Sequence, residues 1–192
     1  MEVQEALIKR RSIRQFKQER LERSDLESIA NAGRLAPNAS NMQPLHFIMI
    51  DKPSVTKGIT GNIVWAKYLN DWNPPTDKLP VAYILILVDT RITNTNYGYD
   101  VGMAAENIMI SAMGFGIGSC CIASINRKEI ARILKIPKRY VVTLMIALGY
   151  PAEEPLITDA KHSITYYRDE KGTLHVPKRK GTIHSIPHNL EE

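Results

Sequence analysis

The sequence predicts one folded domain that contains both α-helices and β-strands. Its 192 residues suffice for one domain with a buried core but are few for two independent ones. Hydrophobic residues make up 44% and charged residues 23%, close to the averages of globular proteins, which argues against a disordered or fibrous chain. Apolar residues recur at helical spacing in some segments and form short continuous runs in others, so both kinds of element are expected.

Two helices are expected before residue 35. Residues 3–10 carry apolar side chains at helical spacing. Ser24 and Glu27 have the spacing of a capping box, which predicts that a second helix begins there and continues to about residue 32. Gly33 is expected to end this helix as its C-cap. The basic residues between the two helices are expected to form a turn.

Three further helices are predicted downstream. Ser54 is a candidate N-cap for a helix that runs to about residue 70. Residues 97–113 are apolar at helical spacing and polar at few positions, which is typical of a central helix. Asn126 is the expected N-cap of a last helix, which ends before Pro137.

Continuous apolar runs predict the strands, and the most apolar of them, residues 81–88, is expected to be buried on both faces. The predicted strands are residues 45–50, 81–88, 117–125 and 140–148. Residues 165–176 have the pattern of a hairpin around a polar turn, and a basic segment and tail, residues 177–192, follow it.

The charge pattern argues against nucleic acid as a partner. The net charge is +5, but the basic residues are scattered and concentrate only at residues 9–14 and 178–180, without interleaved aromatic residues. Two small clusters suit a bound phosphate better than a duplex. The first residues are polar and acidic, and no apolar run reaches the roughly 18 residues of a membrane helix, so we expect a cytoplasmic protein without membrane contact.

The cysteine and histidine content predicts neither a disulfide nor a metal site. Cys120 and Cys121 are adjacent, which disfavours a structural disulfide between them, and they are expected to be reduced, buried thiols. The five histidines lack the close spacing of metal ligands. No protein nucleophile stands out.

Arginines crowd the segment RRSIRQF, residues 10–16, and two interpretations are equally open. Cations near the end of a helix interact favourably with its dipole. Alternatively, Arg10, Arg11 and Arg14 with the Ser12 hydroxyl could bind a phosphate, whose oxygens guanidinium groups match in pairs.

Two other segments are informative. Residues 36–44 combine amide side chains with two prolines, which gives either an ordinary turn or a rigid array of donors and acceptors. The glycines of residues 114–118 follow a helix and precede a strand, the reverse of a dinucleotide-binding fingerprint, so they predict a C-cap and a tight turn.

Five motifs taken together resemble the nitroreductase family of FMN-dependent oxidoreductases. They are RRSIRQF at 10–16, APNASNMQP at 36–44, AAEN at 104–107, GIGSCCI at 116–122 and PKRK at 177–180. The resemblance runs from end to end. It implies an α+β fold with a mostly antiparallel central sheet surrounded by helices, and an intertwined homodimer with FMN at the subunit interface.

The resemblance also implies the activity. NAD(P)H would reduce FMN, and a nitroaromatic, quinone or related acceptor would then be reduced in a ping-pong cycle. Alternatives are a flavin reductase, enoate reductase or dehalogenase of the same fold, and an FMN-binding protein without enzymatic activity. The flavin carries the redox chemistry, so no protein acid or base is assigned.

In the family's arginine motif, the first arginine and the serine reach the phosphate and ribityl chain, and the third basic residue lies near flavin N1 and O2. Here these residues are Arg10, Ser12 and Arg14, and Arg11 would add backbone or charge. A cation near N1 and O2 stabilises the negative charge of reduced flavin, so Arg14 is the candidate catalytic residue.

The remaining implied contacts come from four other segments. In the amide loop, which the partner subunit supplies, they are Pro37, Asn38, Ala39, Asn41 and Gln43; Asn38 replaces the family's usual serine. Backbone N–H groups facing flavin N5 and O4 come from Cys121, Ile122, Ala123 and Ser124. Lys67, on the expected helix after the first strand, is a candidate for the pyrimidine edge. A second phosphate clamp would come from Lys178, Arg179 and Lys180.

Overall fold

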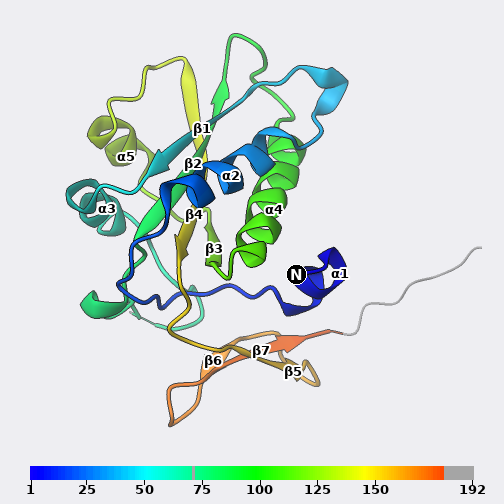
Figure 1. Cartoon of the computed structure of the whole chain (residues 1–192), viewed down its shortest axis with the longest axis vertical. Helices are drawn as coiled ribbons and strands as arrows, with labels where there is room; N and C mark the ends of the chain where they lie inside the picture. The colour runs from blue at the N-terminus through cyan, green and yellow to red at the C-terminus, as the bar shows by residue number, and fades with distance from the viewer. Residues whose placement is uncertain (71, 180–192) are drawn as a thin grey trace, which may run out of the picture.

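The computed structural model describes residues 1–70 and 72–179, and its larger sheet has four antiparallel strands (Figure 1). The strands lie in the order β1 (Leu45–Ile50), β2 (Ala82–Asp89), β4 (Tyr140–Gly149) and β3 (Gly118–Ile122). Strand β3 therefore forms one edge of the sheet. The helices with this antiparallel sheet confirm the predicted α+β class.

Strand β2 is buried along its whole length because helices cover both faces of the sheet. Side chains alternate between the two faces along a strand. Ile84 and Ile86 pack in a core with α2 (Arg23–Arg34) and α4 (Gly98–Gly114). Tyr83 and Leu85 pack in a second core with α3 (Pro53–Thr60) and α5 (Arg127–Ile133). The prediction of a strand buried on both faces is confirmed.

The ends of two helices differ from the predictions. Helix α2 begins at Arg23, its N-cap residue Glu22 makes no side-chain capping bond, and Ser24 is inside the helix. Gly33 does not cap α2 but lies within it. A Cβ atom at Gly33 would lie 2.7 Å from the side chain of Ile108 on α4, so glycine is needed there for helix packing.

Helix α3 ends at Thr60, ten residues before its predicted end. The side-chain amide of Asn62 donates to the carbonyl oxygen of Gly58 (3.0 Å), where a continuing helix would place a backbone N–H. The chain therefore leaves the helix after Thr60, and residues 61–70, which include Lys67, form a loop. By contrast, Asn126 caps α5 as predicted, and its side-chain oxygen accepts from the N–H of Glu129.

The basic segment after α1 (Val3–Lys9) is extended rather than a turn. Ser12 forms a parallel bridge with Ser119 of β3, and the N–H of Ile13 donates to the carbonyl oxygen of Ser119 (2.9 Å). A Cβ atom at Gly118 would lie 2.9 Å from the side chain of Ile13. The segment can lie this close to β3 only because residue 118 lacks a side chain.

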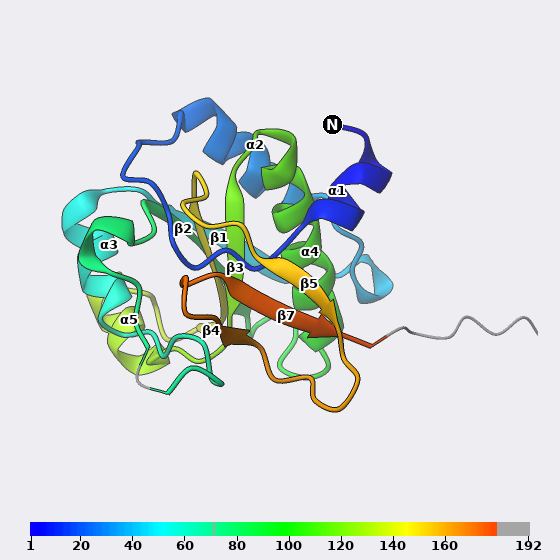
Figure 2. The same ribbon diagram turned by 90° about the horizontal axis from the view of Figure 1, so that it is seen from below.

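A second, smaller sheet lies below the first in Figure 1 and in front of it in the view from below (Figure 2). Its strands lie in the order β5 (Leu156–Asp159), β7 (Leu174–Lys178) and β6 (Tyr167–Arg168). Strands β6 and β7 form the antiparallel pair predicted as a hairpin, and β5, which was not predicted, pairs in parallel with β7. Two short 3-10 helices, Ala39–Asn41 and Thr76–Lys78, complete the elements. None of the helices in the described ranges combines the length and apolar character needed to cross a bilayer.

Candidate functional site

The extended basic segment places three predicted site residues on one face. Ile13 is buried in the core, and Ser12 and Arg14 flank it in the chain. Because extended residues alternate between faces, Arg10, Ser12 and Arg14 share the face opposite Ile13. The arrangement therefore places the side chains of these three residues on one face of the segment, whereas Arg11 lies on the other face.

Arg11 instead caps the first helix. Its guanidinium donates to the carbonyl oxygens of Ile8 (2.7 Å) and Arg10 (2.6 Å). Ile8 belongs to the last turn of α1, so Arg11 has the helix-end role that the sequence left open. Arg10 forms an ion pair with Glu106 of α4, with 3.1 Å between Nε and Oε1.

The Arg14 side chain opens onto a cavity of about 140 Å³ beside β3. The lining residues are Arg14, Val64, Trp65, Ala66, Lys67, Cys120, Cys121, Ile122, Ala123, Ser124 and Tyr166. The structure therefore brings together Arg14, Lys67 and the whole predicted segment 121–124. Pockets for small ligands usually measure about 300 Å³ or more, so this cavity can hold only part of one.

Lys67 reaches this cavity from a loop, not from the predicted helix. The loop is fixed to the end of β3, because Ile63 forms a bridge with Ile125 and the N–H of Val64 donates to the carbonyl oxygen of Ser124 (2.9 Å). Ala66 has a φ of 43°, which turns the backbone in front of Lys67.

A backbone N–H group of β3 faces the same edge. In an antiparallel pair, alternate residues turn their N–H and C=O groups toward the neighbouring strand and away from it. The carbonyl oxygen of Ser119 points away from β4, since it accepts from Ile13. Two residues further along β3, the N–H of Cys121 has the same orientation and faces the open edge near Arg14.

The two cysteines are free thiols with different exposure. Cys120 is buried as predicted, and burial raises its pKa. The prediction of burial is wrong for Cys121, which is exposed on the edge strand. Surrounding protein atoms nevertheless raise the pKa of Cys121 to about 11, so its thiol is protonated at neutral pH. Among the described residues, no three side chains of the usual metal-binding types come together.

The amide loop lies at the other end of the larger sheet from the basic segment (Figure 1). Its backbone is strained, with positive φ at Ser40, Asn41 and Gln43. The N–H of Ala39 donates to the buried carboxylate of Asp100 on α4 (3.0 Å), which fixes the loop. Within one chain, Pro37, Asn38, Ala39, Asn41 and Gln43 are therefore not brought to the Arg14 cavity.

The predicted second phosphate clamp is only partly described. Lys178 ends β7, and its carbonyl oxygen accepts from the N–H of Ala160 (3.1 Å). Arg179 follows and is exposed. Lys180 lies outside the described residues.

Two residues near the cavity were missed from the sequence. The ring of Tyr166 lies under the guanidinium of Arg14, 4.9 Å from ring centre to Cζ, and packs edge-to-face against Tyr68. Glu153 accepts from the backbone N–H of Arg14 (2.5 Å). Both come from distant parts of the chain, and no local pattern indicates their proximity to Arg14.

The chain matches known proteins over most of its length. The Nitroreductase family model matches residues 7–150. A relative from Archaeoglobus fulgidus, named provisionally as an NADH dehydrogenase/NAD(P)H nitroreductase, is 31% identical over 152 residues, with 76% of this chain and 83% of the relative covered. A solved FMN-dependent nitroreductase from Clostridium difficile R20291 is 28% identical with a TM-score of 0.65, covering 78% of this chain and 87% of that one. A Parabacteroides distasonis structure, 19% identical, shares the fold with a TM-score of 0.71 over 97% of both chains. The chain belongs to the nitroreductase family.

Proposed function

We propose that the protein is an FMN-dependent oxidoreductase that uses NAD(P)H as the electron donor. The observation that carries this proposal is the shared face of Arg10, Ser12 and Arg14 beside the open edge of β3. Membership of the nitroreductase family supports the same conclusion, as does the likeness to an FMN-dependent nitroreductase.

The chemistry of the donors fits FMN. Its phosphate is an anion that guanidinium and hydroxyl groups bind well, which suits Arg10 and Ser12. Its ring gains negative charge on reduction, which suits Arg14 and the N–H of Cys121 at the other end of the same face. Bound FMN would supply the redox chemistry, accepting hydride from NAD(P)H and passing electrons to the acceptor. Arg14 would stabilise the charge that develops, and the protonated cysteine thiols would act as neither nucleophile nor base.

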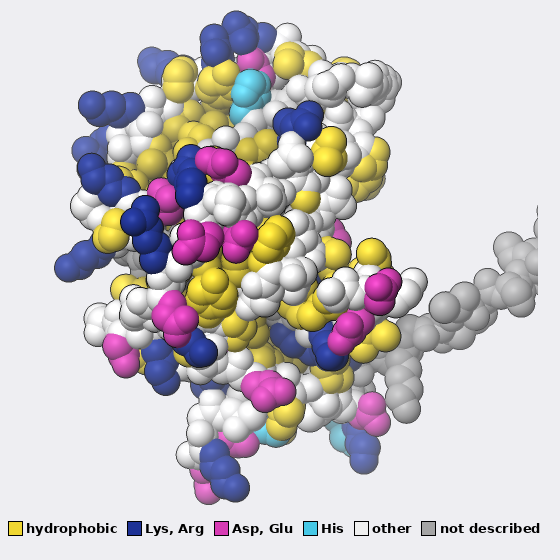
Figure 3. Space-filling model, viewed as in Figure 1, with side chains coloured by type: hydrophobic (Ala, Val, Ile, Leu, Met, Phe, Trp, Pro, Cys, Tyr) yellow, Lys and Arg dark blue, Asp and Glu magenta, His cyan; other side chains and the backbone are white. Residues whose placement is uncertain are grey.

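The complete site would be formed by two copies of the chain. The 140 Å³ cavity is too small for a whole flavin, and the amide loop lies at the far end of the sheet in the same chain. Apolar side chains come to the surface near α1 and α4, as Figure 3 shows, and could be covered by a second copy. They include Val3, Leu7 and Ile8 of α1 and Tyr99 and Met103 of α4. In this homodimer, Asn38, Asn41 and Gln43 of one subunit would face Arg14 of the other.

The acceptor would be a nitroaromatic, a quinone or a related molecule that replaces the oxidised nicotinamide in a ping-pong cycle. A panel of acceptors tests this, with a flavin, an enone and a halogenated aromatic compound included for the narrower reactions known on flavoenzymes. Activity with the enone alone, for example, would make the protein an enoate reductase.

Purified protein reconstituted with FMN should retain the flavin through gel filtration and elute at the mass of a dimer. Its flavin absorbance should bleach when NADH or NADPH is added anaerobically and return when the acceptor is added. Protein that does not retain FMN would contradict the proposal. Protein that retains FMN but is bleached by neither nicotinamide would be a flavin-binding protein and not this enzyme.

A further inference from the structure

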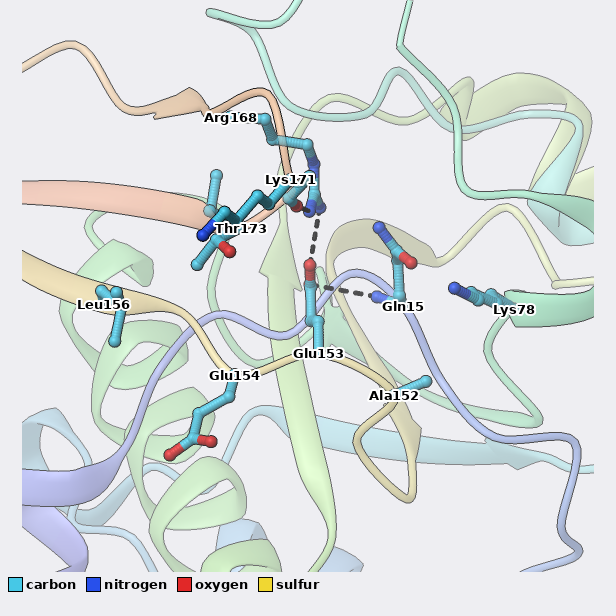
Figure 4. Close-up of a pocket in the computed structure, with 11 residues that line it drawn as sticks. Gln15, Lys78, Ala152, Glu153, Glu154, Leu156, Arg168, Lys171 and Thr173 are labelled. Carbon is cyan, nitrogen blue, oxygen red and sulfur yellow. Dashed lines mark hydrogen bonds and ion pairs between the residues drawn. The ribbon is translucent and has the colours of Figure 1, made fainter.

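The carboxylate of Glu153 lies beside the backbone of the basic segment, on the side away from the cavity that the Arg14 side chain lines. Its Oε1 atom accepts from the N–H groups of Arg14 (2.5 Å) and Gln15 (3.1 Å). Its Oε2 atom accepts from the guanidinium of Arg168 (2.6 Å), as Figure 4 shows. Only 7% of the Glu153 side chain is exposed. A carboxylate this buried is bound by partners on both oxygens, as burial of a charge requires.

Glu153 continues a backbone pairing that begins at the end of β4. The N–H of Lys17 donates to the carbonyl oxygen of Tyr150 (2.8 Å), and the N–H of Ala152 donates to that of Gln15 (2.9 Å). Beyond this point the segment makes no further strand pairing with the described residues until Ser12 reaches β3. The Glu153 side chain supplies the acceptor for the intervening N–H groups, including that of Arg14.

Arg168 connects this contact to the smaller sheet. Its other terminal nitrogen donates to the carbonyl oxygen of Gly172 (2.8 Å), and its Cζ atom lies 4.8 Å from the ring centre of Trp72. The Arg168 side chain is 14% exposed. The buried ion pair between Glu153 and Arg168 therefore joins three parts of the chain, namely the basic segment, the chain after β4 and the hairpin.

We propose that Glu153 is a positioning residue that holds the Arg14 backbone so that the guanidinium stays at the edge of the flavin cavity. The proposal rests on the proposed FMN-dependent function. The N–H of Arg14 points to Glu153, whereas its side chain lines the cavity, so a displaced backbone displaces the cation. A misplacement of about 1 Å at a reacting centre can cost about 100-fold in rate.

Glu153→Gln tests the proposal in the FMN-bound dimer and in the flavin-free protein. The glutamine keeps the shape, but both carboxylate oxygens of Glu153 accept hydrogen bonds, so in either orientation the NH2 group of the amide faces a donor and the side chain has to move away. In the flavin-free protein, amide hydrogen exchange in peptides that span residues 14 and 15 should become at least about tenfold faster. In the FMN-bound protein, the ratio of the affinity for oxidised flavin to the affinity for reduced flavin should rise at least tenfold. This rise corresponds to a fall in the flavin midpoint potential of at least about 30 mV.

The sign of the potential change separates positioning from simple electrostatics. Removing the negative charge of Glu153 without any movement would favour the reduced, anionic flavin and raise the potential. Displacing Arg14 removes a cation from the flavin and lowers it. An unchanged or raised potential in Glu153→Gln would overturn the proposal. Glu153→Asp keeps the charge of the ion pair but shortens the side chain, and it should also lower the flavin midpoint potential. This variant carries the test if Glu153→Gln does not fold.

Three controls complete the test. Glu154→Gln changes the neighbouring, exposed carboxylate and should leave both measurements as in the natural protein. Glu153→Gln with Arg168→Gln removes the clash between donors and should restore slow exchange and the original potential. In an Arg14→Ala background, Glu153→Gln should produce no further fall, because the cation that it positions is gone. An equal fall in that background would contradict the proposal.

The outcome also separates this inference from the proposed function. If the natural protein does not retain FMN, the proposed function fails. If the natural protein retains FMN and is reduced by NAD(P)H, but Glu153→Gln and Glu153→Asp keep its potential, only the role of Glu153 fails.

Discussion

Arg14 combines a fixed backbone with a side chain at the mouth of the cavity. Its N–H is held by Glu153, and its guanidinium lies against the ring of Tyr166. A cation over an aromatic face is attracted by about 0.5–1 kcal/mol at an exposed site. Tyr166 thus helps to keep the guanidinium at the edge of β3, where the proposed flavin gains negative charge.

Replacing Arg14 with alanine should slow reduction of bound FMN by NAD(P)H about 100-fold, the usual effect of losing a donor to a developing charge. It should also make the flavin midpoint potential more negative. FMN affinity should fall less, because Arg10 and Ser12 would still bind the phosphate end. Stopped-flow reduction and a redox titration measure the two effects.

Arg11→Ala is the matched control for this prediction, since the Arg11 side chain donates to carbonyl oxygens at the end of α1. It should leave the potential unchanged. If Arg14→Ala only loosened FMN and did not shift the potential, the assignment of Arg14 to the flavin ring would be wrong.

At the scale of single elements, the basic segment depends on two glycines of the neighbouring strands. Cβ atoms at Gly118 and Gly149 would lie 2.9 Å from the side chains of Ile13 and Phe16. Ile13 and Phe16 anchor the segment in the core between α3, α5 and the sheet. The absence of side chains at residues 118 and 149 therefore allows the binding face to lie directly on the larger sheet.

Gly118→Ala should push this segment away from β3. We expect a loss of about 1–3 kcal/mol in the free energy of unfolding, as for other overpacked cores, together with weaker FMN binding. Urea denaturation and flavin titration measure the two effects. Gly114→Ala is the control, because a Cβ atom there would have no atom from another described part of the chain within 4 Å. Equal stability of the two variants would contradict the close packing at Gly118.

The turn after β2 gives a pH-dependent prediction. The Arg91 side chain bonds to the carboxylate of Asp89 and lowers its pKa to about 2. A carboxyl whose pKa is lower in the folded state stabilises that state above its unfolded pKa of about 3.9, and this contribution is lost as the pH falls toward 2. The stability difference between the natural protein and Asp89→Asn should thus be constant above about pH 5 and shrink below it.

Denaturant unfolding across this pH range measures the difference. Asp77→Asn, which changes an exposed carboxylate in the second 3-10 helix, is the control for the loss of a negative charge at the surface. A difference for Asp89→Asn that does not shrink in acid would mean that the ion pair contributes nothing through its charge.

The strands could be predicted better than the helix ends. The apolar runs at residues 45–50, 81–88 and 140–148 match strands to within one residue, because short continuous apolar runs are typical of strands that pack in a core. The role of Gly33 depends on its contact with Ile108 of another helix, which no local pattern records. Strand β5 was missed because it is short and mostly exposed.

At the scale of the whole molecule, the proposed site is divided between two ends of the sheet. The sequence motifs indicated which residue types bind flavin in this family, and Arg14, Lys67 and residues 121–124 do meet at one cavity. Motifs carry no information on Glu153 or Tyr166, because those residues approach Arg14 only through the path of the chain after β4. The separation of the amide loop from the cavity within one chain agrees with the expectation that the partner subunit supplies this loop.

Mixing two defective chains tests the two-chain site. Arg14→Ala impairs one half of the site, and Asn41→Ala with Gln43→Ala impairs the other half. If each site takes one half from each chain, a mixed dimer contains one intact site and one doubly impaired site. Random reassociation of equal amounts should then restore about a quarter of the sites, measured as rapidly reduced FMN.

Reassociation of each variant with itself is the control and should restore none. A mixture that stays as inactive as its components would show that both halves come from the same chain.

The hydrogen bond between Arg14 and Glu153 joins residues that are 139 positions apart. This distance has a consequence for synthesis on the ribosome. At typical elongation rates of about 5–20 residues per second, the ribosome adds Glu153 roughly 7–28 s after it has added Arg14. During that time the arginines have neither the carboxylate nor the hairpin to hold them. The proposed flavin site would therefore lack the Arg14–Glu153 contact until residues 1–153 have been made, so FMN incorporation would follow their synthesis.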